Sequence, residues 1–187
     1  MSSIWAGKCV RLRPPEPEDQ RVFAQFHEHS TDQRNEGIIR PPIAVTELMR
    51  AADERARHDH APDTFQLTIE RTSDGSVVGG IATQNVDTRS GNFSYGLIIG
   101  HEHQQHGYAT EAITILLTYM FGECRYHKCE VSMYEFNAGS IALHRKLGFV
   151  EEGRLREHIY SAGSFHDMIM MGMTAKEFAA HHPFHGF

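Results

Sequence analysis

The residues at positions 104–110 have the composition of a turn that binds anions. Residues 93–99 before them alternate in side-chain size and polarity, which predicts a half-buried strand. Residues 109–121 after them place apolar side chains three and four positions apart, which predicts one apolar helix face. Such a helix would direct its unpaired N–H groups into the turn, and a glycine there would let a pyrophosphate approach the backbone. The turn consists of Gln104, Gln105, His106, Gly107, Tyr108, Ala109 and Thr110.

A second segment of interest begins at Asn137 and ends at Phe149. It reads Asn-Ala-Gly-Ser-Ile-Ala-Leu-His-Arg-Lys-Leu-Gly-Phe. Asn137 is suited to the N-cap of a short helix, and Gly148 to the position just past its C-terminus. Ser140 is a further capping candidate.

Together the two segments resemble the GCN5-related N-acetyltransferase (GNAT) superfamily. The first is similar to its acyl-CoA signature Gln/Arg-x-x-Gly-x-Gly/Ala, and the second to its element Asn-x-x-Ser/Ala-x-x-x-Tyr-x-x-x-Gly-Phe. A third stretch, residues 152–156 with 165–167, resembles the branch that includes the ribosomal-protein-alanine N-acetyltransferases. The resemblance covers most of residues 8–175. It implies an α+β fold with a central, mostly antiparallel seven-stranded sheet, flanked by helices and splayed between its fourth and fifth strands.

The resemblance also implies how acetyl-CoA would be held. Backbone groups of Leu97, Ile98 and Ile99 would pair with the pantetheine arm, and one of these amides would polarise the thioester carbonyl. The turn at 104–110 would wrap the pyrophosphate, mainly through N–H groups. Asn137, Ser140 and His144 would complete the cofactor site. The alternative for the turn is an ordinary connection between a strand and a helix.

Acetyl transfer from a thioester to an amine needs a neutral amine, donors for the oxyanion and a proton for the leaving thiolate. In the ribosomal-protein branch, the residue matching Ser140 lies near the CoA sulfur as a proton donor. His144 stands where many members carry a tyrosine with that role, although a histidine is mostly neutral at pH 7. The glutamate expected to order a deprotonating water falls at Ile159. The nearest replacements as general base are Glu135, which we favour, and Glu157 and His158.

Several further side chains are candidates for the wall of the acceptor pocket. They lie near the ends of the strands at 93–99 and 128–134, and in the polar loop expected at 30–43. They are Tyr95, Glu102, Phe136, Asn35, Glu36 and Arg40.

Composition indicates one domain spanning residues 1–187, with a core at about 8–175 and a short tail at 176–187. The chain is 40% hydrophobic and 22% charged, which is ordinary for a globular protein. No apolar run approaches the ~20 residues of a membrane span, and no secretory leader is evident, so we expect a cytoplasmic protein without a membrane partner. The three cysteines have no metal-type spacing and are expected to be reduced thiols.

The formal charge of −6 argues against a nucleic-acid partner and is compatible with a cationic amine. The expected partners are therefore acetyl-CoA and an amine acceptor, with the protein a monomer or a homodimer. The 14 histidines include local clusters, but none has the spacing of a zinc motif, so no metal is expected. These clusters are His58 with His60, His101 with His103 and His106, and His181 and His182 with His185.

Hydrophobic periodicity and turn residues predict the order of elements. The expected helices are 17–28, 46–58, 109–121 and 140–147, with a helical turn at 176–180. The expected strands are 8–13, 64–70, 77–86, 93–99, 128–134, 150–159 and 165–173.

The sequence thus predicts an acetyl-CoA-dependent N-acetyltransferase in which a primary amine attacks the thioester directly within a ternary complex. The amine could belong to a protein N-terminus, a polyamine, an amino acid or an antibiotic. The alternative is a non-catalytic acyl-CoA-binding sensor or regulatory protein. A histidine-rich metal-binding module is a third hypothesis. A dinucleotide-binding fold is disfavoured because no Gly-x-Gly-x-x-Gly follows the first strand.

Overall fold

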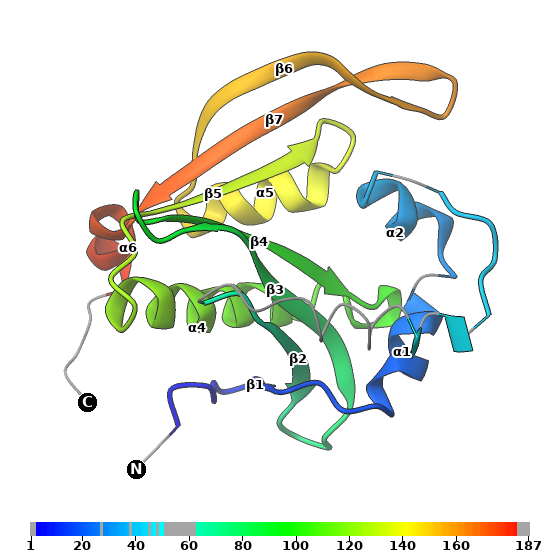
Figure 1. Cartoon of the computed structure of the whole chain (residues 1–187), viewed down its shortest axis with the longest axis horizontal. Helices are drawn as coiled ribbons and strands as arrows, with labels where there is room; N and C mark the ends of the chain where they lie inside the picture. Colours follow the sequence, from blue (N-terminus) through cyan, green and yellow to red (C-terminus); the bar gives the residue numbers. More distant parts are fainter. Residues whose placement is uncertain are drawn as a thin grey trace.

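A computed structural model of the chain describes residues 3–26, 28–37, 39–44, 46–47, 49–50 and 63–182. In these residues seven strands form one sheet in the order β1-β2-β3-β4-β5-β7-β6 (Figure 1). Neighbouring strands are antiparallel except β4 and β5, which are parallel. The strands are β1 Val10–Arg13, β2 Gln66–Arg71, β3 Val77–Asp87, β4 Asn92–Ile99, β5 Lys128–Tyr134, β6 Val150–Ser161 and β7 Ser164–Thr174.

The helices lie around this sheet. Apart from the expected helix at 46–58, each predicted helix and strand begins and ends within two residues of its expected limits. The expected helix at 46–58 is helical at its four described residues, 46, 47, 49 and 50, and its other positions lie outside the described residues. None of the described helices is long and apolar enough to cross a membrane. The helices are α1 Asp19–Phe26, α2 Ser30–Asn35, the short 3-10 helix η1 His101–His103, α4 Tyr108–Gly122, α5 Ala138–Leu147 and α6 Ala175–His181.

The expectation of a loop throughout residues 30–43 is wrong, because α2 occupies its first part. Six polar residues have no apolar helical pattern of their own, and so short a helix is not stable in isolation. It is held by tertiary contact instead. Asp32 is 8% exposed, and its Oδ1 accepts a hydrogen bond of 3.1 Å from Gln104 Nε2.

The two faces of the sheet are covered by different helices. Gly80 and Gly100 face α1, since an added Cβ would lie 3.1 Å from the ring of Phe23 and 2.2 Å from that of Phe26, respectively. Phe93 projects from the opposite face of β4 and packs against Phe121 of α4, with ring centroids 5.6 Å apart. Because side chains alternate along a strand, odd-numbered β4 residues face α4 and even-numbered ones face α1.

The sheet opens between its two parallel strands. β4 pairs with β5 only through Asn92 with Lys128, Phe93 with Cys129, and Ser94 with Glu130. Beyond this point β4 continues to Ile99 and β5 to Tyr134, but the two strands no longer pair with each other. The two strands therefore diverge into a wedge, which confirms the predicted splay (Figure 1).

Glu111, in the first turn of α4, holds the beginning of β1. Its carboxylate accepts hydrogen bonds from the backbone N–H groups of Lys8, Cys9 and Val10, at 2.7, 2.7 and 2.8 Å. Gly7 leaves room for this carboxylate, because an added Cβ would lie 2.4 Å from the Glu111 side chain. The contact joins the sheet edge to the helix that begins at the 104–110 turn.

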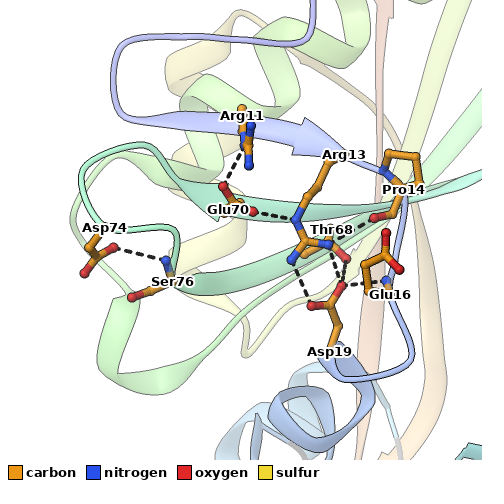
Figure 2. A network of polar contacts seen from close by, with 9 residues as sticks. All are labelled: Arg11, Arg13, Pro14, Glu16, Asp19, Thr68, Glu70, Asp74 and Ser76. Atoms are coloured by element: carbon orange, nitrogen blue, oxygen red, sulfur yellow. Dashed lines mark hydrogen bonds and ion pairs between the residues drawn. The ribbon is translucent and has the colours of Figure 1, made fainter.

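A buried charge network joins β1, β2 and α1 (Figure 2). The Arg13 guanidinium donates to both oxygens of Asp19, at 2.8 and 2.9 Å, and also to Glu70. Thr68 and the Glu16 amide donate to Asp19 as well. Burial acts to raise the pKa of Asp19, but these hydrogen bonds outweigh it and hold the pKa below its ordinary value.

We expect Arg13→Met to lower the free energy of unfolding by about 2–4 kcal/mol, because the Asp19 carboxylate is left buried without its cation. Arg13 and Asp19 side chains are 21% and 5% exposed. The matched control is Arg11→Met: Arg11 also pairs with Glu70 but is 55% exposed, so its loss should cost less than about 1 kcal/mol. Urea denaturation measures both. Equal losses in the two variants would contradict the assignment.

The same network predicts an acid dependence of stability. Hydrogen bonds from Arg11, and then from Arg13, lower the pKa of Glu70 below 4.5, and the pKa of Asp19 lies below 3.8. A pKa that is lower in the folded than in the unfolded state adds stability above the unfolded value, and this stability is lost as pH falls through the folded value. The stability difference between wild type and Arg13→Met should therefore be full above about pH 4.5 and shrink below it. Denaturation curves from pH 7 to pH 3 measure this difference, and a constant one would contradict the prediction.

Candidate active site

The turn at 104–110 has backbone geometry suited to an anion. Gln105 and Gly107 adopt left-handed φ values of 64° and 83°, and Gly107 is the N-cap of α4. Both are exposed, as is His106 between them. Successive N–H groups in such a turn form a concave nest for an anion, and the positive end of the 15-residue α4 adds to it.

Side chains fix the shape of this turn. Gln104 Nε2 donates to Ile99 O at 3.3 Å as well as to Asp32, which ties the turn to β4 and α2. His106 Nδ1 donates to Gln104 O at 2.7 Å, and its ring stacks on Tyr108 at 5.5 Å. The remaining two expected residues, Ala109 and Thr110, lie half-buried in the first turn of α4.

The wedge exposes one side of β4 to a ligand. Leu97, Ile98 and Ile99 pair with β3 on one side but with no strand on the other. Unpaired backbone groups at a strand edge can hydrogen-bond an extended ligand, as a further strand would. These three residues are half-buried, so this edge remains open to a narrow chain.

Helix α5 borders the wedge from the β5 side. Asn137 is its N-cap, with Oδ1 accepting from the Ser140 N–H at 3.1 Å. Gly148 closes it in the left-handed conformation, with φ 98°. Both capping roles predicted from the sequence are thus present.

His144 of α5 lies inside the protein and reaches across to β4. It is 5% exposed, and its Nε2 lies 2.9 Å from the hydroxyl of Tyr95. Its Nδ1 lies 2.8 Å from Ser140 O and 3.3 Å from Ser140 Oγ. Burial lowers the pKa of His144, although the bond to the Ser140 carbonyl opposes this, and burial raises that of Tyr95. The neutral forms of both rings are therefore favoured.

The general-base candidates lie at the end of β5 and on β6. Glu135 is exposed just past β5, with Oε1 3.3 Å from His166 Nδ1 and Oε2 3.4 Å from Arg154 Nη1. Glu157 and His158 are exposed on β6. Because a carboxylate has about four acceptor sites, Glu135 can also accept a hydrogen bond from water or an amine beside these two partners.

Helix α2 joins the two sides of the wedge. Asp32 contacts Gln104 beyond the end of β4. Gly37, in the turn after α2, lies against the end of β5, since an added Cβ would be 2.5 Å from the Tyr134 hydroxyl. Figure 1 shows α2 beside the ends of β5 and α5. Of the expected wall residues, Asn35 is the last residue of α2, Glu36 is its C-cap, and Arg40 lies beyond it. Phe136 stacks on Tyr134, with ring centroids 5.4 Å apart.

Sequence reasoning missed Asp32 and placed Tyr95 differently. Asp32 was hidden in a polar segment without periodicity, and its Oδ2 is buried without a hydrogen-bond partner, 3.8 Å from His101 Nδ1. Tyr95 was expected to line the acceptor pocket, but it is 7% exposed and bonded to His144. The alternation of β4 places Tyr95 inward, which was the available indication.

Two other features lie apart from these residues. A cavity of about 460 Å³ lies along α1, and none of the expected site residues lines it; its walls are Arg21, Ala24, Gln25, Glu28, Thr46 and Met49. Within the described ranges, no group of three or more histidine, cysteine, aspartate or glutamate side chains is arranged to hold a metal. The histidines at 58, 60 and 185 fall outside those ranges.

The splayed sheet with an anion-binding turn after β4 defines an acyltransferase fold, and comparison with known proteins identifies the family. Residues 10–150 match the family described as Acetyltransferase (GNAT) domain. The chain is also 34% identical over 180 residues to the SPbeta prophage-derived uncharacterized N-acetyltransferase YokL of Bacillus subtilis, covering 96% of this chain and 98% of that protein. The chain therefore belongs to the GNAT family and is an enzyme of the N-acetyltransferase class.

Two further similarities are more distant. The spermidine N(1)-acetyltransferase of Escherichia coli K12 is 27% identical over 177 residues, covering 95% of this chain and 92% of that protein. The crystal structure of spermidine N-acetyltransferase from Vibrio cholerae in complex with CoA and spermine superposes with a TM-score of 0.80 at 21% identity. It covers 92% of this chain and 99% of that one. This superposition confirms the predicted fold.

Gly107, with its left-handed backbone, can be compared with Gly139 through a matched pair of substitutions. Neither Gly107 nor Gly139 has an atom within 4 Å of an added Cβ, but only Gly107 has a positive φ. Gly107→Ala should therefore cost about 1 kcal/mol through backbone strain. Gly139→Ala in α5 should instead raise the free energy of unfolding by about 0.4–1 kcal/mol. Urea denaturation of both variants measures this, and a loss at Gly139 equal to that at Gly107 would contradict it.

Proposed function

We propose that this protein transfers the acetyl group of acetyl-CoA to a primary amine, by direct attack of the amine on the thioester in a ternary complex. The observation that carries the proposal is the wedge between β4 and β5, which leaves one side of Leu97–Ile99 without a neighbouring strand and has the 104–110 turn beyond the end of β4. An extended ligand with a pyrophosphate at one end fits this arrangement.

Acetyl-CoA has these properties. Its pyrophosphate would bind the N–H groups of the turn, with Gln104, Gln105, His106, Gly107, Tyr108, Ala109 and Thr110 around it. Its pantetheine arm would pair with the free edge at Leu97, Ile98 and Ile99, and one of these amides would donate to the developing oxyanion. Asn137 would contact the arm from α5, next to Ser140 and His144.

Chemistry would then require two proton movements. The amine nitrogen attacks the thioester carbon, the C–S bond breaks, and the electron pair stays on sulfur. The nitrogen loses a proton, which we assign to Glu135 acting through water. The sulfur gains a proton from the α5 side of the wedge, where Ser140 and His144 lie.

Four acceptors are considered: a protein N-terminus, a polyamine, an amino acid and an antibiotic amine. The polyamine has the most support. The similarity to a spermidine N(1)-acetyltransferase extends over 95% of this chain. The net charge of −6 would favour the approach of a cationic substrate. Polyamines are therefore the first acceptors to test.

A non-catalytic acyl-CoA sensor is the second candidate. Two observations favour it: Ile159 stands where the resemblance to the ribosomal-protein branch implies a glutamate, and burial lowers the pKa of His144 and so favours its neutral form. A sensor would bind acetyl-CoA and release no thiol with any amine.

The test is thiol release from acetyl-CoA with product mass spectrometry, across polyamines, amino acids, aminoglycosides and peptides with varied N-termini. We expect one class, led by spermidine, to give an acetylated product well above background hydrolysis. Tight acetyl-CoA binding by calorimetry with no product from any acceptor would support the sensor instead. Absence of both binding and product would contradict both candidates.

Ser140→Ala should then lower kcat by about 100-fold while leaving the KM for acetyl-CoA within about twofold, because a general acid acts in the transition state. The matched control is Ser73→Ala, an exposed serine in the turn between β2 and β3, which should leave kcat unchanged. An unchanged kcat in Ser140→Ala would exclude Ser140 as the proton donor.

A further inference from the structure

Tyr95, His144 and Ser140 form a chain of close polar contacts where β4 and β5 separate. Tyr95 is the first β4 residue past the last β4–β5 pair, at Ser94 with Glu130. Its hydroxyl lies 2.9 Å from His144 Nε2, and His144 Nδ1 lies 2.8 Å from Ser140 O and 3.3 Å from Ser140 Oγ. The chain therefore connects β4 to the first turns of α5.

The contacts determine which nitrogen of His144 carries the proton. A carbonyl oxygen can only accept, so the 2.8 Å contact with Ser140 O requires a hydrogen on Nδ1. The ring is 5% exposed, and burial without an opposite charge disfavours the imidazolium. Nε2 is then unprotonated and accepts the hydrogen of the Tyr95 hydroxyl, for which the described residues offer no other hydrogen-bond acceptor.

This arrangement fixes the direction of the Ser140 hydroxyl. Because His144 Nδ1 carries a hydrogen, it can only donate toward Ser140 Oγ. The hydroxyl hydrogen of Ser140 is therefore not directed at His144 and is free to be donated elsewhere. This is the reverse of a serine–histidine nucleophile pair, in which the histidine accepts the serine proton.

The position of Ser140 along the wedge agrees with donation to a ligand. Since β5 is parallel to β4 and α5 returns along β5, Ser140 lies nearer than His144 to the open ends of the strands. One helical turn is about 5.4 Å, and a strand advances about 3.3 Å per residue. With His144 opposite Tyr95, Ser140 lies about two residues further along β4, at the level of Leu97.

We propose that Tyr95 is a positioning residue that fixes the tautomer of His144, and thereby keeps the Ser140 hydroxyl oriented as the proton donor to the departing CoA thiolate. His144 is then not the acid itself, which revises the expectation that it takes the place of the family's tyrosine. The inference rests on the proposed function.

The proton movements balance. As the C–S bond breaks, sulfur takes the Ser140 hydroxyl proton, and Ser140 Oγ takes a proton from water in the wedge. The proton lost by the attacking nitrogen passes through water to Glu135 and from there to solvent, so no net charge accumulates in the protein. The Nδ1–H of His144 stabilises the negative charge that develops on Ser140 Oγ during transfer.

The first test needs no activity. Nitrogen-15 NMR of histidine-labelled protein separates the two tautomers and the imidazolium, and the His144 signals are assigned by their loss in His144→Asn. We expect the Nδ1–H tautomer in wild type from pH 6 to 8. We expect a mixture of tautomers in Tyr95→Phe, because a ring whose Nε2 has lost the Tyr95 donor can turn away from the Ser140 carbonyl. A wild-type Nε2–H tautomer, or an imidazolium at pH 7, would overturn the proposal.

The second test is kinetic and uses isosteric variants. Asn at position 144 places an amide donor near the position of Nδ1, whereas Gln places one near that of Nε2. We expect Tyr95→Phe and His144→Gln each to lower kcat about tenfold or more, with the KM for acetyl-CoA within about twofold. His144→Asn should retain most of kcat. The control Tyr160→Phe removes a hydroxyl from a tyrosine that is 62% exposed on β6 and should change nothing.

The pH profile separates positioning from acid catalysis. If the imidazolium of His144 were the acid, the pH profile of wild-type kcat would have an alkaline limb, in which kcat falls as the imidazolium loses its proton. His144→Asn would abolish that limb. With Ser140 as donor, that limb is absent from the pH profiles of the wild type, Tyr95→Phe, His144→Gln and His144→Asn. A limb removed by His144→Asn, or full kcat in Tyr95→Phe despite reduced thermal stability, would overturn the proposal. Failure of the wild type to acetylate any amine would instead count against the proposed function, and the NMR result would still decide the tautomer.

Discussion

The early end of the pairing between β4 and β5 is the constraint on which the rest of the molecule depends. Three residue pairs join the two strands, and beyond them β4 pairs only with β3 and β5 only with β7. Unpaired backbone groups inside a sheet are costly unless another group satisfies them. Where β4 and β5 separate, an extended cofactor can supply the missing partners.

Those neighbouring elements hold by polar contacts as well as by apolar packing. Glu111 ties the start of β1 to α4, while Arg13 ties β1 and β2 to α1 through Asp19 and Glu70. Both contacts lie on the β1 side of the sheet, far along the chain from α5. Glu111 lies in the first turn of the helix whose N-terminus forms the anion-binding turn, so its contact joins that end of the helix to β1. The buried Tyr95–His144 contact joins β4 to α5.

Much of this architecture follows from local patterns. Hydrophobic periodicity predicted β5 at 128–134 and the apolar face of α4, and the capping residues Asn137 and Gly148 marked the ends of α5. Helix α2 could not be predicted, because its six polar residues depend on contacts of Asp32 with a turn 72 positions away. The contact of Tyr95 with His144 spans 49 positions, and no local pattern reports whether a histidine on a short helix faces solvent or a strand. The candidate site residues were thus named from type and spacing, but their mutual orientation could not be.

Helix α2 has a thermodynamic consequence. It contacts the anion-binding turn through Asp32 and Gln104, and the end of β5 through Gly37 and Tyr134, so it belongs to both sides of the opening. A ligand that displaces α2 from one side must work against its contacts on the other. The binding of a ligand at the turn and of a ligand at the end of β5 would therefore be linked through α2. If the cofactor changes the affinity for the acceptor by some factor, the acceptor must change the affinity for the cofactor by the same factor.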